Sequence, residues 1–164
     1  MARSHHGSGL PRLDTEIVLV TEEGPPSVGI VVVSHSADVA DATVGLVRQL
    51  ANLDKGGPRL IAAGGLEDGS VGTDAVRIAA AIARADAGAG VVVMADLGSA
   101  VLSAFTALEE LLDADAAPRV AISGGPLVEG TFVAAVQASA GDTLDGVRAA
   151  ADEAAAMDKL GDRR

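Results

Sequence analysis

The sequence of 164 residues lacks cysteine, tryptophan and tyrosine, and its only aromatic residues are Phe105 and Phe132. Without cysteine there is no disulfide framework and no thiolate chemistry, which fits a reducing, cytoplasmic location. With so few aromatic side chains, the core must consist of Val, Ile, Leu and Ala. Such a core suits helices packed closely on a sheet.

Basic residues are scarce as well: 12 Lys and Arg stand against 23 Asp and Glu, for a net charge of −11. This charge would repel the phosphates of a nucleic acid, so no nucleic-acid partner is expected, whereas a basic protein partner is permitted. No apolar run reaches the roughly 18–20 residues of a membrane span, and the start does not read as a signal peptide. We therefore expect no membrane association.

Several familiar site motifs are missing. The sequence has no Walker-type phosphate loop, no Gly-x-Gly-x-x-Gly fingerprint and no Gly-x-Ser-x-Gly elbow, so nucleotide, dinucleotide and serine-hydrolase sites of those kinds are not expected. His35 is the only histidine outside the N-terminal tail. With no cysteine beside it, a structural zinc site is not expected either.

The length suffices for one ordinary domain, with an extension before it. Residues 1–27 have the composition of a disordered extension or tag, in which His5 and His6 could bind a metal only weakly. Within it, 15–21 has β propensity but is stopped by Glu22–Pro26, so an added edge strand is the minority interpretation. We place one domain at 28–160 and a C-terminal tail at 161–164.

The domain shows a regular alternation of strands and helices. Apolar runs at 28–33, 59–63 and 90–95 begin 31 residues apart, which is the length of a strand plus a crossover helix. Because these runs are continuously apolar, we expect a parallel sheet covered on both faces. A fourth strand is expected at 119–123, and the last helices at 127–140 and 143–159. The predicted fold is an α/β three-layer sandwich with a central, mainly parallel sheet of four or five strands. The expected inward helix faces are Val39, Thr43, Val47 and Leu50; Val76, Ala79, Ile82 and Ala83; and Val101, Phe105, Leu108 and Leu112.

Three polar loops should meet at one edge of this sheet: Ser34–Ser36, Gly72–Ala75 and Asp96–Ser99. Thr73 or Asp74 could cap the second helix and Ser99 the third. Helix N-termini offer unpaired N–H groups to a phosphate, and Gly72 and Gly98 would allow its close approach.

His35 can carry the chemistry at this edge. A neutral imidazole is a competent nucleophile toward a phosphoryl group, and Asp96 at the end of the neighbouring strand could fix its tautomer. Taken singly, His35 could also be a hydrogen-bonded turn residue, and Asp96 and Gly72–Asp74 could be simple helix caps. Their convergence favours a site, because capping alone predicts no lone histidine there.

Five segments in order resemble the phosphotransfer subunit of phosphoenolpyruvate-dependent dihydroxyacetone kinase, the DhaM type, which has the fold of the mannose-family enzyme IIA. The likeness covers about 28–157, and the combination is specific although each segment alone is weak. The segments are Val31–Ser36, Ile61–Gly64, Gly72–Val76, Val93–Ala100 and Pro126–Gly130.

The resemblance implies a phosphotransferase whose His35 accepts a phosphoryl group from phospho-HPr. His35 would then pass the group to ADP held on the L subunit of the kinase, and the resulting ATP would phosphorylate dihydroxyacetone on the K subunit, a step of glycerol metabolism. It also implies a homodimer, and no metal or cofactor in this subunit. Some relatives append HPr-like and enzyme-I-like domains after this one, whereas the sequence ends at Arg164, so this chain is expected to depend on separate carriers.

The resemblance also assigns roles to individual residues. His35 would react through Nε2 while Asp96 orients Nδ1. Five residues beside them would bind the phosphate, and three more, in a further motif of the family, would be partner-facing or structural. These are Ser36, Gly72, Thr73, Gly98 and Ser99, and then Pro126, Glu129 and Gly130.

Two other functions share most of these features. An enzyme IIA of a mannose-type sugar transporter has the same fold and histidine, but its third loop tends to be longer; the compact Asp96–Ser99 and the Gly72–Asp74 motif favour the kinase subunit. A regulator that binds a protein partner according to its phosphorylation state would keep His35 and act through its surface.

Overall fold

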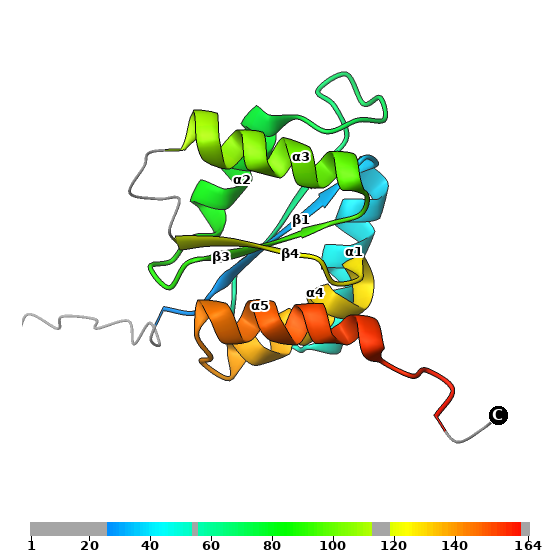
Figure 1. Cartoon of the computed structure of the whole chain (residues 1–164), viewed down its shortest axis with the longest axis vertical. Coiled ribbons are helices and arrows are strands. Elements are labelled where there is room, and N and C mark those ends of the chain that lie inside the picture. The colour runs from blue at the N-terminus through cyan, green and yellow to red at the C-terminus, as the bar shows by residue number, and fades with distance from the viewer. Residues whose placement is uncertain (1–25, 54–55, 113–118, 162–164) are drawn as a thin grey trace, which may run out of the picture.

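The structure, a computed structural model, describes residues 26–53, 56–112 and 119–161 (Figure 1). The extension expected at 1–27, with the minority strand at 15–21, therefore lies outside the described residues except for its last two positions, as does 162–164 of the expected C-terminal tail. In the described part of the chain, no helix combines the length and apolar character needed to cross a bilayer.

Four strands form one parallel sheet in the described residues, in the order β2-β1-β3-β4. The expected parallel sheet is thus confirmed, and each strand begins one residue later than its predicted start. The strands are β1 (Gly29–Ser34), β2 (Leu60–Gly64), β3 (Val91–Ala95) and β4 (Val120–Ser123).

Helices cover both faces of the sheet, as expected for a three-layer sandwich (Figure 1). The last predicted helix, 143–159, is shorter than expected: it ends at Glu153 and continues only as one 3₁₀ turn. The helical elements are α1 (Ala37–Leu50), α2 (Ala75–Ala85), α3 (Gly98–Thr106), the π-helical turn η2 (Ala107–Leu111), α4 (Leu127–Ser139), α5 (Leu144–Glu153) and the 3₁₀ turn η4 (Ala154–Ala156).

The alternating side chains of the strands build two cores. Ile30 and Val32 of β1 pack under α1, α4 and α5, whereas Val31 and Val33 pack under α2 and α3. All residues of β1 are buried, because this strand lies between β2 and β3 and under helices on both faces. Residues that follow β1 are consequently held at the end of a strand that is buried throughout.

The inward faces of the first three helices differ from the prediction. Val39 and Leu50 of α1, Val76 of α2 and Phe105 of α3 are exposed. In α2 and α3 most of the buried residues are alanines, whose small side chains let the helix axis approach the flat sheet closely, whereas α1 buries mainly larger residues. The buried residues are Ala40, Thr43, Val44 and Val47 in α1; Ile78, Ala79, Ala81, Ile82 and Ala85 in α2; and Ala100 and Ala104 in α3.

Candidate functional site

The polar residues expected at one sheet edge follow the two central strands. β1 and β3 are neighbours at the centre of the sheet. The connection after β1 leads to β2 on one side, and the connection after β3 leads to β4 on the other, so the strand order reverses between β1 and β3. The space beyond the carboxyl ends of such a strand pair is the usual binding position in open α/β sheets. Val33 is level with Ala95 in the β1–β3 register, which places Ser34 and His35 beside Asp96.

Both ring nitrogens of His35 have side-chain partners. Nδ1 lies 2.9 Å from Oδ1 of Asp96, and Nε2 lies 2.8 Å from the hydroxyl of Ser99. Because a carboxylate only accepts hydrogen bonds, Nδ1 carries the proton, and Nε2 then accepts one from Ser99. The side chain of His35 is 22% exposed, so a partner protein can reach it.

Asp96 is held as a carboxylate. Partial burial raises its pKa, but hydrogen bonds from the His35 backbone N–H, the Ser34 hydroxyl and the His35 ring, together with the charge of that ring, outweigh it and leave the pKa of Asp96 below the usual value. Its Oδ1 also accepts the N–H of Leu97 at 2.7 Å. A negative charge therefore persists beside Nδ1 at all ordinary pH values.

Ser34 belongs to this network, although the sequence did not single it out. Its hydroxyl donates to Oδ2 of Asp96 at 2.8 Å and accepts the N–H of Ser36 at 3.1 Å. Ser34 is buried at the end of β1. The register could have revealed it, since the residue level with Asp96 in a neighbouring parallel strand is Ser34.

Two helices begin beside His35. α1 starts at Ala37, where Ser36 accepts the N–H of Val39 as N-cap, and α3 starts at Gly98, where the N-cap Leu97 offers no side-chain acceptor. Within the described residues, the N–H groups of Gly98 and Ser99 have no hydrogen-bond partner. Unpaired donors and the positive end of the helix dipole favour an anion near Nε2.

The other predicted phosphate-binding residues are close to His35, but some of their polar groups are already engaged. The Gly72 N–H donates to the carbonyl of His35 at 2.9 Å, and the Thr73 hydroxyl pairs with Ser103 of α3 at 2.7 Å. A Cβ on Gly72 would lie within 3.0 Å of the Leu66 side chain, so packing on Leu66 accounts for this glycine. Gly98 has open space around its Cα.

The structure decides between the expected caps. Asp74 caps α2 by accepting the N–H groups of Val76 and Arg77, so of the two candidates Thr73 is not the cap. The prediction that Ser99 caps the third helix is wrong, because α3 begins at Gly98 with Leu97 as its N-cap, two residues before Ser99. The Ser99 hydroxyl is instead available to His35.

The Pro126–Gly130 motif lies next to the Asp96 loop. Pro126 is the N-cap of α4, and Glu129 forms an ion pair with Lys159. A Cβ on Gly130 would come within 2.6 Å of Met94, which gives this glycine a packing role. A cleft of about 560 Å³ opens between the motif and the loop, lined among others by Asp96, Leu97, Pro126, Glu129 and Lys159.

The arrangement around His35 presents a nucleophilic nitrogen with a fixed tautomer to a surface rich in anion-binding groups, which suits reversible transfer of a phosphoryl group. A family model described as "PTS system fructose IIA component" (EIIA-man) matches residues 29–148, from β1 into α5. The chain belongs to the EIIA-man family. This fits the phosphohistidine-carrier chemistry that the site geometry suggests.

Three relatives of the chain are named as phosphoryl donor subunits of dihydroxyacetone kinases. The chain is 41% identical over 111 residues to the Listeria innocua "PEP-dependent dihydroxyacetone kinase 2, phosphoryl donor subunit DhaM", covering 68% of this chain and 86% of that protein. It is 42% identical over 115 residues to the Klebsiella michiganensis DhaM subunit, covering 69% of this chain but only 24% of that protein. It is 41% identical over 115 residues to the Escherichia coli K12 DhaM subunit, covering 69% of this chain and 24% of that protein.

The fold is also shared with a solved structure. EF1359, a protein of unknown function, superposes with a TM-score of 0.66 at 33% identity, covering 77% of this chain and 94% of that chain. The predicted α/β sandwich is confirmed by this likeness and by the parallel sheet, and the predicted EIIA-man fold by the family model.

Proposed function

We propose that this chain is the phosphoryl donor subunit of a phosphoenolpyruvate-dependent dihydroxyacetone kinase, in which His35 carries the phosphoryl group. The observation that supports this best is the pairing of both ring nitrogens, Nδ1 with Asp96 and Nε2 with Ser99. Together with the similarity to DhaM subunits, it favours a carrier that takes up a group from one protein and gives it to another. The chain would act as a relay and would not bind dihydroxyacetone itself.

In the first step, Nε2 of His35 attacks the phosphorus of phospho-HPr. A new P–N bond forms as the donor's P–N bond breaks, and its electron pair returns to the donor's histidine. The ring of His35 becomes positively charged, and Asp96 stabilises that charge through Nδ1–H. The Ser99 hydroxyl must leave Nε2 for this attack, and it can then donate to a phosphoryl oxygen along with the N–H groups of Gly98 and Ser99.

In the second step, the terminal phosphate oxygen of ADP on the L subunit attacks the same phosphorus. The bond from phosphorus to Nε2 breaks, its electron pair returns to Nε2, and ATP forms. A phosphohistidine suits this role because its P–N bond is reactive, so transfer proceeds in both directions with positioning and charge stabilisation alone. In this step Asp96 only keeps its hydrogen bond to Nδ1–H and exchanges no proton.

We further propose that the chain forms a homodimer. In the described residues β4 pairs only with β3, so its other side is an open strand edge. Val120, Ala121 and Ile122 on it carry no charge, and an unprotected apolar edge favours pairing with another chain. Light scattering after gel filtration would test this: a dimer has twice the 16.2 kDa chain mass, and a monomer at all concentrations contradicts it.

The test of the proposed function is to incubate the chain with phosphoenolpyruvate, enzyme I and HPr and to locate the acid-labile phosphate by mass spectrometry. We expect one phosphate on His35, and its loss when ADP-loaded L subunit is added. His35→Ala should accept none, whereas the matched His5→Ala/His6→Ala variant, which removes the other histidines of the chain, should behave as the parent. Phosphate on His35→Ala would overturn the proposal.

One finding favours a second candidate. The description of the matching family model refers to a fructose IIA component, so the acceptor could be the IIB protein of a sugar transporter. The same experiment separates the two: phospho-His35 that survives ADP-loaded L subunit but is discharged by a IIB protein supports the transporter role.

A further inference from the structure

Two strand ends in this fold carry the same hydrogen-bonded clamp on an aspartate. At the end of β1, Oδ2 of Asp96 accepts both the Ser34 hydroxyl at 2.8 Å and the next backbone N–H, that of His35, at 2.9 Å. The N–H of Ser36 then donates to the Ser34 hydroxyl at 3.1 Å. One carboxylate oxygen is thus fully occupied by the strand end.

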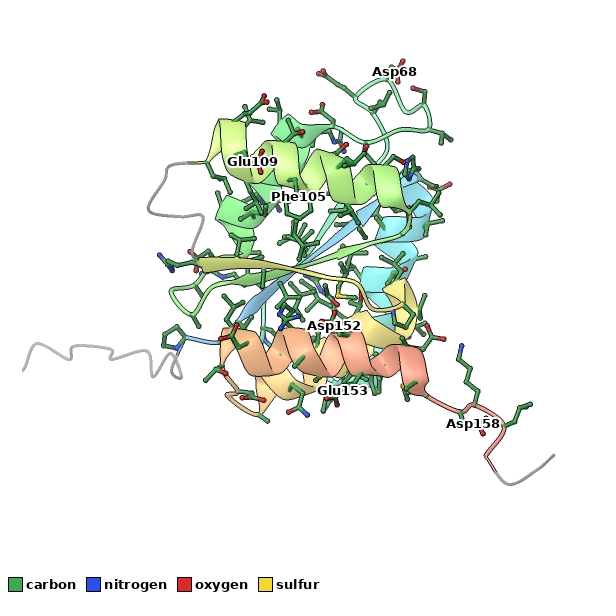
Figure 2. All side chains as sticks on the ribbon, in the orientation of Figure 1. Asp68, Phe105, Glu109, Asp152, Glu153 and Asp158 are labelled. Carbon is green, nitrogen blue, oxygen red and sulfur yellow. The ribbon has the colours of Figure 1, made fainter. Side chains whose placement is uncertain are left out.

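The end of β4 repeats this pattern without a histidine. Oδ1 of Asp152 accepts the Ser123 hydroxyl at 2.6 Å and the N–H of Gly124 at 2.9 Å, and the N–H of Gly125 donates to Ser123 at 3.1 Å. Asp152 comes from α5, below β4 in the view of Figure 2. Gly124 occupies the place that His35 has in the first clamp.

In each clamp the second carboxylate oxygen is left for a nitrogen-bearing side chain. Oδ1 of Asp96 accepts Nδ1 of His35, and Oδ2 of Asp152 accepts the Arg148 guanidinium at 2.6 Å. In both clamps the serine hydroxyl and the next backbone N–H donate to one carboxylate oxygen, and the following N–H donates to the serine. This arrangement fixes the rotation of the carboxylate, whichever side chain pairs with its other oxygen. The terminal torsion of an aspartate is intrinsically only weakly defined, and without Ser34 the backbone donors left to hold Asp96 would be the N–H groups of His35 and Leu97.

From this repeated geometry we infer that Ser34 is a positioning residue for the phosphoryl transfer at His35: it locks Asp96 in the rotation that directs Oδ1 at Nδ1. This rests on the proposed function of His35. The Ser34 hydroxyl has no other role open to it, because it is buried and both donates and accepts within the clamp. Ser34 acts on His35 only through Asp96 and does not touch the reacting nitrogen.

The twin clamp provides a matched control. Ser34→Ala and Ser123→Ala each remove one donor to a carboxylate and one acceptor of a backbone N–H, so both should lower the melting temperature to a similar degree. We expect only Ser34→Ala to change His35. Its phosphorylation by phospho-HPr should slow about tenfold, as the loss of a hydrogen bond to a charged group predicts, while Ser123→Ala stays within about twofold of the parent.

A second readout does not depend on phosphorylation. Nitrogen-15 NMR of the unmodified protein in alkaline buffer, where imidazole is neutral, reports which ring nitrogen of His35 bears the proton. We expect the Nδ1–H form in the parent and in Ser123→Ala, and a mixture with the Nε2–H form in Ser34→Ala. If alanine at position 34 unfolds the chain, Ser34→Cys keeps a similar volume with a weak donor and should give the same mixture.

The outcomes separate this inference from the proposed function. A parent that is never phosphorylated defeats the proposed function, yet the tautomer comparison still tests Ser34. A Ser34 variant that folds and keeps both the parental tautomer and the parental rate overturns the positioning role.

Discussion

At the scale of single residues, the tautomer and orientation of the His35 ring are set by Asp96, which follows β3, and by Ser99 of α3. Asp96 takes Nδ1 and Ser99 takes Nε2, so each nitrogen has a distinct task before any partner arrives. Position at the carboxyl ends of adjacent parallel strands made the His35–Asp96 pair predictable from sequence. Ser34 would have followed from the strand register, which the sequence does not give. The pairing of Ser99 with His35 depends on the first residue of α3, which propensity locates only to within a residue or two.

Removing the charge of Asp96 gives a pH-dependent loss of stability. Because the pKa of Asp96 in the folded chain lies below its ordinary value of 3.8, its carboxylate stabilises the fold above that value, and the effect disappears as pH falls through the folded-state pKa. We expect Asp96→Asn to lower the unfolding free energy by about 1–2 kcal/mol at neutral pH. Urea titrations of both proteins should show this difference shrinking as the pH falls below 3.8 and through the lowered pKa of Asp96; a difference that grows on acidification contradicts the assignment.

Ser99→Ala tests the hydroxyl on Nε2. The variant loses a donor for the phosphoryl oxygens, and we expect phosphorylation of His35 to slow about tenfold in rapid-quench measurements. Ser103→Ala is the control, since Ser103 lies on the same helix and bonds Thr73 instead of His35. Equal rates for the two variants would show that Ser99 is dispensable for transfer.

At the scale of elements, strands were easier to predict than helix faces. The continuous β-branched runs of the strands indicate burial on both faces of the sheet. The helices contain so many alanines that more than one face of a helix looks apolar in the sequence. In α3 the large Phe105 suggested one face, yet Ala100 and Ala104 touch the sheet. In α1, Val39 and Leu50 are exposed, and Ala40 and Val44 are buried in their place. The buried face of a helix depends on how closely its axis can approach the sheet. A ranking of single residues by hydrophobicity does not include this effect.

Two glycines in helices should respond oppositely to alanine. A Cβ at Gly130 of α4 would lie 2.6 Å from Met94 and 3.2 Å from the carbonyl of Ala151, whereas a Cβ at Gly45 of α1 would meet nothing within 4 Å. We expect Gly130→Ala to destabilise the fold by about 1–3 kcal/mol through overpacking. Gly45→Ala should stabilise it by about 0.5–1 kcal/mol through helix propensity.

Chemical denaturation of the two variants beside the parent checks this pair. A destabilised Gly45→Ala would mean that α1 is packed differently from the structure. A neutral Gly130→Ala would mean the same for the α4–α5 contact.

At the scale of the whole molecule, charge is the dominant property. The chain carries a net charge of −11, and Asp68 on the loop between β2 and α2 projects from the body of the molecule in Figure 2. Hydrogen bonds from the side chain and the backbone N–H of Ser70 lower the pKa of Asp68, so this carboxylate stays ionised. Such a surface steers a partner with a basic face toward the molecule.

Salt should therefore weaken the encounter with the phosphoryl donor that we propose, phospho-HPr. Raising the ionic strength from about 0.05 to about 0.5 M shortens the screening length from more than 10 Å to less than 5 Å, and we expect the KM for phospho-HPr to rise several-fold with little change in kcat. Steady-state phosphorylation assays at several salt concentrations measure both. A KM that does not change with salt would show that the acidic surface plays no part in recruiting the donor.

The alanine-rich contacts of α2, α3 and α4 with the sheet have a consequence for how the state of His35 is communicated. Alanine has no side-chain rotamers, so the helix–sheet contacts have few alternative packings into which the interior could shift. A carrier built this way has little means of signalling through a change of shape. We expect its partners to distinguish the loaded from the empty form by the charge and bulk of the phosphoryl group alone, so that the two forms have nearly identical backbones.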